Sequence, residues 1–280
     1  MNVQILPQTL QSLIEIVGKD FVFTDEFTRA AYGHDETEDY VFPPSVVVKP
    51  STPKEVSDIL QLANELEIPV TAIGARTGLS GGALSIHQGI GLSMERFNKI
   101  IEIDEKNLQV TVEPGVITQV LQDTVLEKGL SYPPDPSSKG SCFIGGNVSE
   151  NSGGARAVKY GVTKDYVLNL EVVLSNGEII WTGANTLKNS TGYNLTQLMV
   201  GSEGTLGIIT KIVLKLVPKS NHTLLMLVPF YQANQACEAV SAIFRAGIVP
   251  SALEFMERDA IDWTLKLVEG INVQVQDGIQ

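Results

Sequence analysis

Glycines are the residues of this chain whose number and spacing most clearly indicate chemistry, because twenty of the 25 lie between positions 74 and 207. They gather in separate clusters, interleaved with Ser, Thr and Asn. Glycine lets the backbone approach a ligand closely, and successive backbone N–H groups can form a nest for anionic oxygens. Several such clusters predict one extended anionic ligand, such as a dinucleotide, bound along the main chain. The clusters occupy residues 74–82, 144–147, 151–154 and 201–208.

These clusters do not fit either of two familiar nucleotide-binding patterns. The chain contains no G-x-G-x-x-G and no G-x-x-x-x-G-K-[ST]. In addition, the cluster at 74–82 leads into residues 89–94, which are expected to form a strand rather than to open a helix. The Rossmann and P-loop patterns therefore do not explain the glycines.

Charge and composition limit the kinds of partner. The 32 Asp and Glu residues outnumber the 20 Lys and Arg residues, which gives a net charge of −12. A nucleic-acid-binding protein usually presents a basic face, so this balance argues against nucleic acid. Cys142, Cys237 and the three histidines match no metal-ligand spacing, so we expect reduced thiols and no metal site.

The chain shows no targeting or membrane segment. It has no secretory signal and no apolar run of about 18 residues. We therefore expect a cytoplasmic protein, with peripheral attachment to the inner face of the membrane as the alternative.

The hydrophobic pattern predicts a mixture of helices and strands, and the first glycine cluster directly follows one of the strands. Thr52 can cap a helix that has Pro53 in its first turn, and Glu55 completes a capping box. Asn176-Gly177 indicates a hairpin. Helices are expected within 6–32 (two short ones) and at 53–66, 118–128, 231–245 and 258–268, and strands at 45–48, 70–73, 89–94, 100–103, 108–112, 168–174, 178–182, 206–216, 223–228 and 252–255.

Several motifs resemble those of a known superfamily. Pro44-Ser-Val-Val-Val-Lys-Pro50, Thr77-Gly-Leu-Ser-Gly-Gly82 and Val112-Glu-Pro-Gly-Val116 are similar to the FAD-linked oxidases of the p-cresol methylhydroxylase and vanillyl-alcohol oxidase superfamily. Within it, the chain resembles the branch of the glycolate oxidase FAD subunit and the D-lactate or D-2-hydroxyacid dehydrogenases. The resemblance covers about residues 20–260. The motifs of that branch are Tyr132-Pro-Pro-Asp-Pro-Ser-Ser138, Ile144-Gly-Gly-Asn147, Lys159-Tyr-Gly-Val-Thr-Lys-Asp165, Thr191-Gly-Tyr-Asn194 and Gly201-Ser-Glu-Gly-Thr-Leu-Gly-Ile208.

The resemblance implies an α+β fold with two parts. An FAD-binding domain of the p-cresol methylhydroxylase type would span residues 1–218, in two α+β subdomains of about 1–104 and 105–218. An incomplete ferredoxin-like cap would follow at 219–280. A polar run after Pro218 supports that boundary.

The resemblance also implies which residues hold FAD without a covalent bond. The family's arginine is Ile73 here, and Ala75 and Arg76 replace glycines, so Arg76 either adds charge to the phosphate site or points outward. Thr77 stands where some members carry a histidine that attaches FAD covalently. The implied residues are Gly74, Ala75, Arg76, Thr77, Gly78, Leu79, Ser80 and Gly81 around the pyrophosphate; Pro134, Asp135, Ser137 and Ser138 at the border of the flavin; Gly145, Gly146, Asn151, Gly153 and Gly154 along the isoalloxazine and ribityl region; and Glu203, Gly204, Gly207 and Ile208 to complete the site.

The implied activity is oxidation of a D-2-hydroxyacid, such as D-lactate or glycolate, to the 2-oxoacid with hydride transfer to FAD. The catalytic residues stay unknown, because the family's His-rich, metal-binding motif would lie beyond this chain, and a divalent metal is expected only with that part. The alternative is a catalytically incomplete FAD-binding module that needs further chain or a partner. A sugar-lactone or alditol oxidase with the same FAD domain is a third interpretation. An iron–sulfur or other electron-transfer subunit, a small 2-hydroxyacid and a second copy of the chain are the expected partners.

Overall fold

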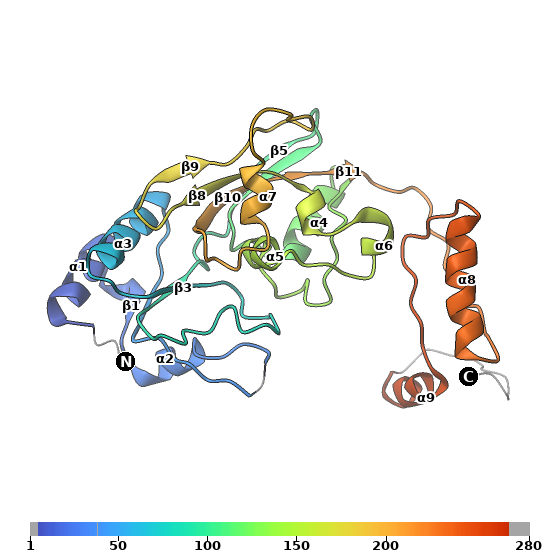
Figure 1. Cartoon of the computed structure of the whole chain (residues 1–280), viewed down its shortest axis with the longest axis horizontal. Coiled ribbons are helices and arrows are strands. Elements are labelled where there is room, and N and C mark those ends of the chain that lie inside the picture. Colours follow the sequence, from blue (N-terminus) through green and yellow to red (C-terminus); the bar gives the residue numbers. More distant parts are fainter. Residues whose placement is uncertain (1–4, 38, 269–280) are drawn as a thin grey trace.

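The computed structural model describes residues 5–37 and 39–268, and it contains two main β-sheets (Figure 1). The first sheet has four strands in the order β1-β2-β4-β3. Strands β2 and β3 both run parallel to β4, whereas β1 is antiparallel to β2. The strands are β1 (Val22–Phe23), β2 (Val46–Val48), β3 (Val70–Ile73) and β4 (Ile90–Ser93).

Three helices accompany this sheet: α1 (Pro7–Val17), α2 (Glu26–Ala31) and α3 (Pro53–Glu65). As predicted, the Thr52 side chain caps α3 by accepting a hydrogen bond from the Glu55 N–H. The Glu55 carboxylate reaches back to the N–H of Ser51 rather than to that of Thr52. The apolar faces of α1 and α3 then pack with β2 and β4 into one core that excludes water.

The second sheet has five antiparallel strands in the order β5-β6-β10-β8-β9. Asn176-Gly177 joins β8 to β9, and the predicted hairpin is confirmed. Strands β6, β8 and β10 supply most of the buried sheet residues of the second core. The strands are β5 (Ile100–Asp104), β6 (Gln109–Val112), β8 (Val167–Val173), β9 (Ile179–Trp181) and β10 (Ile208–Lys215), and β7 (Leu130–Ser131) pairs separately with β11 (Val217–Pro218).

Four helices belong to this second part, and the sequence predicts only α4 (Thr118–Leu126) among them. The other three are short, and the first turn of α5 carries two glycines, which have low helix propensity. Hydrophobic periodicity therefore does not predict these three helices. The three helices are α5 (Ile144–Glu150), α6 (Ala157–Tyr160) and α7 (Leu195–Met199), and two 3-10 turns cover Lys19–Phe21 and Thr163–Asp165.

The segment after Pro218 has helices but no core. Helices α8 (Ala233–Arg245) and α9 (Arg258–Leu267) form as predicted, and Figure 1 shows them apart from both sheets. The predicted strands at 223–228 and 252–255 are wrong: neither segment pairs with a strand in the described structure. A strand requires a neighbour for its backbone hydrogen bonds, and none is present in the described part of the chain. Residues 269–280 of the predicted cap lie outside the described residues, and the boundary at 218 stays a prediction.

Candidate cofactor-binding site

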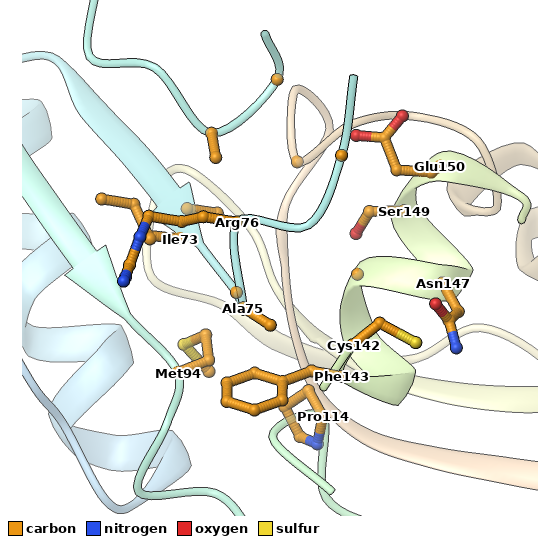
Figure 2. A pocket seen from close by; sticks show the side chains of 18 of the residues that line it. Ile73, Ala75, Arg76, Met94, Pro114, Cys142, Phe143, Asn147, Ser149 and Glu150 are labelled. Atoms are coloured by element: carbon orange, nitrogen blue, oxygen red, sulfur yellow. The ribbon is translucent and has the colours of Figure 1, made fainter. Parts of the chain in front are cut away.

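A cleft of about 140 Å³ lies where the end of β3 meets the start of α5 (Figure 2). Its walls come from both parts of the protein, because the loop after β3 faces α5 and the turn before β10. The lining residues are Asp35, Ala72, Ile73, Gly74, Ala75, Arg76, Thr77, Gly78, Gly82, Ala83, Met94, Pro114, Ser138, Cys142, Phe143, Gly145, Gly146, Asn147, Ser149, Glu150, Ser152, Glu203, Gly204, Gly207, Ile208 and Ile209.

The loop after β3 is held near Gly78 and Ser80 by hydrogen bonds to other segments. The N–H of Glu36 donates to the carbonyl oxygen of Gly78 over 3.1 Å. The Ser80 hydroxyl donates to the Glu150 carboxylate on α5, also over 3.1 Å. The loop therefore spans the cleft between the first sheet and α5.

Three lining glycines leave space that the fold itself does not need. A Cβ on Gly146 would meet no atom within 4 Å, and one on Gly74 or Gly78 would meet its nearest atom at about 4 Å. None of the three has a positive φ, so backbone conformation does not require glycine there either. Bare backbone that faces an open cleft is what close approach of a ligand requires. The open backbone at these three glycines therefore fits an extended cofactor bound in the cleft.

Other glycines are explained by the protein alone. A Cβ on Gly145 would lie 2.5 Å from the Pro114 Cβ, and the Gly145 N–H donates to the Pro114 carbonyl oxygen over 2.7 Å. A Cβ on Gly154 would lie 2.0 Å from the carbonyl oxygen of Asp135. These glycines let neighbouring segments of the site pack closely.

The structure divides the residues expected around the cofactor into two sets. The first set lines the cleft, and it holds Gly74, Ala75, Arg76, Thr77, Gly78, Ser138, Gly145, Gly146, Glu203, Gly204, Gly207 and Ile208. The second set lies outside the lining, and it holds Leu79, Ser80, Gly81, Pro134, Asp135, Ser137, Asn151, Gly153 and Gly154.

Members of the second set support the walls of the cleft. Asn151 ends α5 with a φ of 53°, and its side-chain oxygen accepts from the Lys164 N–H over 2.9 Å. Ser80 ties the loop to α5, as described above. The contribution of each residue to cofactor binding stays a prediction.

Several lining residues were missed by sequence reasoning. Pro114 and Asn147 lie within motifs that the sequence singles out, but they received no role. Cys142 and Phe143 lie between two motifs of the resembled branch, and this position next to the motifs was the sequence feature that could have indicated them. Asp35 and Met94 come from distant segments, and their place in the lining depends on the packing of the first sheet.

Carboxylates dominate the charged groups of the cleft. A Cβ on Gly82 would lie 2.9 Å from Glu150 Oε1 and 3.0 Å from Glu203 Oε2, so these two side chains flank that glycine. Burial raises the pKa of the Glu150 carboxyl; the hydrogen bond from Ser80 opposes this rise, and the charges of Glu203 and Asp35 add to it. An anionic ligand must therefore bind away from this acidic side or offset its charge.

The fold and the site define the class of protein. The solved structure of p-cresol methylhydroxylase with substrate bound superposes with a TM-score of 0.70 at 24% identity, over 84% of this chain and 48% of that chain, which shows a shared fold. A family model described as an FAD binding domain matches residues 44–183, and one described as FAD linked oxidases, C-terminal domain, matches residues 219–275. The chain belongs to the FAD-linked oxidases.

Two curated relatives show which members of that family the chain resembles in sequence. It is 44% identical over 251 residues to the glycolate oxidase subunit GlcD of Bacillus subtilis (strain 168), covering 90% of this chain and 53% of the relative. It is 41% identical over 266 residues to a D-lactate dehydrogenase of Anaerostipes hadrus, covering 95% of this chain and 56% of the relative. The chain thus spans about half the length of these relatives. Among the described residues, no helix combines the length and apolar character that crossing a bilayer requires.

Proposed function

We propose that the chain binds FAD non-covalently in the cleft and forms the cofactor-binding part of an oxidoreductase that acts on a D-2-hydroxyacid. The observation that carries the proposal is the open backbone at Gly74, Gly78 and Gly146, within a region that matches an FAD-binding family model. Backbone N–H groups can hold the oxygens of a pyrophosphate without lysine.

The proposal gives the cleft residues different parts in cofactor binding. The loop that contains Gly74, Thr77 and Gly78 would hold the pyrophosphate, and the first turn of α5 with Gly146 would leave room for the flavin part. Glu203, Gly204 and Gly207 would close the other wall. When bound, FAD supplies a ring system that accepts a hydride from the substrate carbon.

Non-covalent binding is supported by the place of the three histidines. His34, His87 and His222 are exposed, and none of them lines the cleft. Thr77, the lining residue at the position of a possible histidyl link, has no nucleophilic imidazole. The protein therefore offers no histidine for a covalent bond in this loop.

The names of the relatives support the substrate class and a partner. One is a glycolate oxidase subunit and the other a D-lactate dehydrogenase, so a small 2-hydroxyacid is the substrate that we propose. The word "subunit" in the first name supports an electron-transfer partner for this chain. We assign no catalytic base to the described residues.

A second candidate is an FAD-binding module that turns over substrate only with further chain. It is favoured by the segment 219–268, in which no residue is buried. Leu224 and Leu225 are 85% and 93% exposed there, as is expected of a domain that lacks its packing partner. The two candidates share the FAD site and differ in activity.

Flavin binding and flavin reduction test these proposals separately. Purified protein should carry a yellow cofactor that acid precipitation releases into the supernatant. Gly78→Val should weaken FAD binding at least about tenfold because the branched side chain enters the cleft, whereas Gly140→Val, at an exposed glycine outside the cleft with open space, should not. Equal FAD affinity of both variants would contradict the assigned loop.

The second measurement distinguishes the two candidates. Stopped-flow mixing of the FAD-loaded chain with D-lactate or glycolate should bleach the flavin rapidly if the described residues suffice for catalysis. Absence of bleaching, with recovery on addition of the second half of a relative, would favour the module.

A further inference from the structure

Arg76 is the charged residue of the cleft whose role the family resemblance leaves open. It lies in the loop after β3, lines the cleft and has a φ of 60°, a left-handed conformation that non-glycine residues seldom adopt. The family resemblance implies a glycine at this position. The chain thus keeps an arginine at a position where the backbone favours glycine.

The side chain of Arg76 is held by stacking. Its guanidinium carbon lies 4.4 Å from the centroid of the Tyr32 ring, and Tyr32 is buried at the end of α2. Stacking on an aromatic face fixes the guanidinium plane but leaves its N–H groups free. Within the described residues, the guanidinium has no hydrogen-bond or ion-pair partner. Its donors are therefore available to a ligand.

The groups beneath Tyr32 satisfy one another and do not compete for Arg76. The Tyr32 hydroxyl donates to the Glu95 carboxylate, and the Lys49 ammonium pairs with the other oxygen of Glu95 at 2.6 Å. Ser93 donates to the same carboxylate over 3.2 Å. Burial acts to raise the pKa of Glu95, but the hydrogen bonds from Lys49 and Tyr32 outweigh it and lower that pKa. The charges of Lys49 and Glu95, which contact Tyr32, therefore cancel one another.

Charge is distributed unevenly across the cleft. Asp35, Glu150 and Glu203 are acidic, and Arg76 is the one cation among the lining residues that the structure describes. Figure 2 shows the Arg76 side chain on the β3 side of the cleft, opposite Glu150. A phosphate group would therefore be attracted by Arg76 on the β3 side of the cleft and repelled by Glu150 on the α5 side.

We propose that Arg76 binds a phosphate group of the dinucleotide cofactor from its stacked position on Tyr32. This inference rests on the proposed FAD site. The planar fork of a guanidinium matches phosphate oxygens, and charge-assisted hydrogen bonds of this kind are among the stronger ones. The arginine then offsets the carboxylates that the rest of the cleft presents.

The test is equilibrium binding of FAD and of riboflavin, which has no phosphate, to the apoprotein at several salt concentrations. Arg76→Gln removes the charge and keeps the backbone penalty of a non-glycine residue. Arg76→Gly relieves that penalty, so a loss of affinity in this variant does not come from backbone strain. Arg245→Gln, on the exposed surface of α8, is the control for removing one positive charge.

Both Arg76 variants should bind FAD about 10- to 100-fold more weakly at low salt, with a shallower salt dependence. Riboflavin should bind them as it binds wild type, and Arg245→Gln should behave as wild type throughout. Unchanged FAD affinity, or an equal loss for riboflavin, would overturn the proposal. If riboflavin binds none of the proteins measurably, the proposal is overturned when FAD binding to the Arg76 variants has the same salt dependence as FAD binding to wild type. A wild-type protein that binds no FAD would instead refute the proposed function.

Discussion

At the scale of single residues, the Glu150 carboxylate connects the cofactor cleft to pH. It lies at the end of α5, accepts a hydrogen bond from Ser80, and shares the cleft with the carboxylates of Glu203 and Asp35. Its raised pKa means that the folded protein disfavours the ionised form. The stability of the apoprotein should therefore depend on whether Glu150 is charged.

The sign of this dependence follows from linkage between protonation and folding. A carboxyl whose pKa is higher in the folded state contributes stability below its unfolded pKa, and this contribution is lost as the pH rises through the folded pKa. The free energy of unfolding of Glu150→Gln should therefore exceed that of wild type at pH 8 and equal it at about pH 4. Glu150 is buried enough for its pKa to rise but keeps much of its surface in contact with solvent, which screens its charge, so the difference should not exceed about 0.5 kcal/mol.

Urea unfolding at a series of pH values checks this prediction. Glu65→Gln, at an exposed position of α3 outside the cleft, is the control and should show no comparable trend. An advantage of Glu150→Gln that grows as the pH falls would show that the sign is wrong.

At the scale of elements, α5 contributes adjacent glycines that have different physical reasons. Gly145 packs against Pro114, where a Cβ would clash at 2.5 Å. Gly146 meets nothing within 4 Å of such a Cβ and lines the cleft. One glycine thus serves the packing of the helix and the other leaves room beside it.

Substitution of these two glycines by alanine should separate stability from ligand binding. Gly145→Ala should lower the free energy of unfolding by about 1–3 kcal/mol, as overpacking of a tight contact does. Gly146→Ala should not lower it, because alanine favours helix and meets open space, but it should weaken FAD binding. Chemical denaturation and FAD titration of both variants measure the two effects. Loss of stability in Gly146→Ala with unchanged FAD affinity would reverse the assignments.

At the scale of the whole molecule, every buried residue that the structure describes lies before residue 219. The two large cores belong to the two sheets and their helices. From 219 to 268 no residue is buried, although α8 and α9 are regular helices. Stability of the described structure should therefore come almost wholly from residues before 219.

Removal of residues 219–280 tests this distribution of stability. The shortened chain should keep its thermal transition within about 2 °C of that of the full chain, since few stabilising contacts are lost. It should also bind 1-anilinonaphthalene-8-sulfonate less, because the exposed run at 224–228 is gone. Calorimetry and dye fluorescence measure these quantities. A fall of the midpoint by more than about 5 °C would mean that the segment packs on the sheets in solution.

Local chemistry was sufficient for much of the fold. The cap of α3, the strand that ends at Ile73 and the hairpin at Asn176-Gly177 all follow from residues close together in the chain, and the structure confirms them. The glycine motifs likewise led to FAD-linked oxidases, which the family models confirm. Turns, caps and bare backbone depend on near neighbours, so the sequence displays them directly.

Tertiary structure alone decided which distant residues complete the cleft and what each lining side chain faces. Met94 and Asp35 reach it from separate segments, and Arg76 turns toward Tyr32, a partner 44 positions earlier in the chain. The apolar run at 224–228 reads as a strand but stays unpaired in the described structure. A side chain's neighbours and a strand's hydrogen bonds come from distant parts of the chain, so they exist only once those parts are packed together.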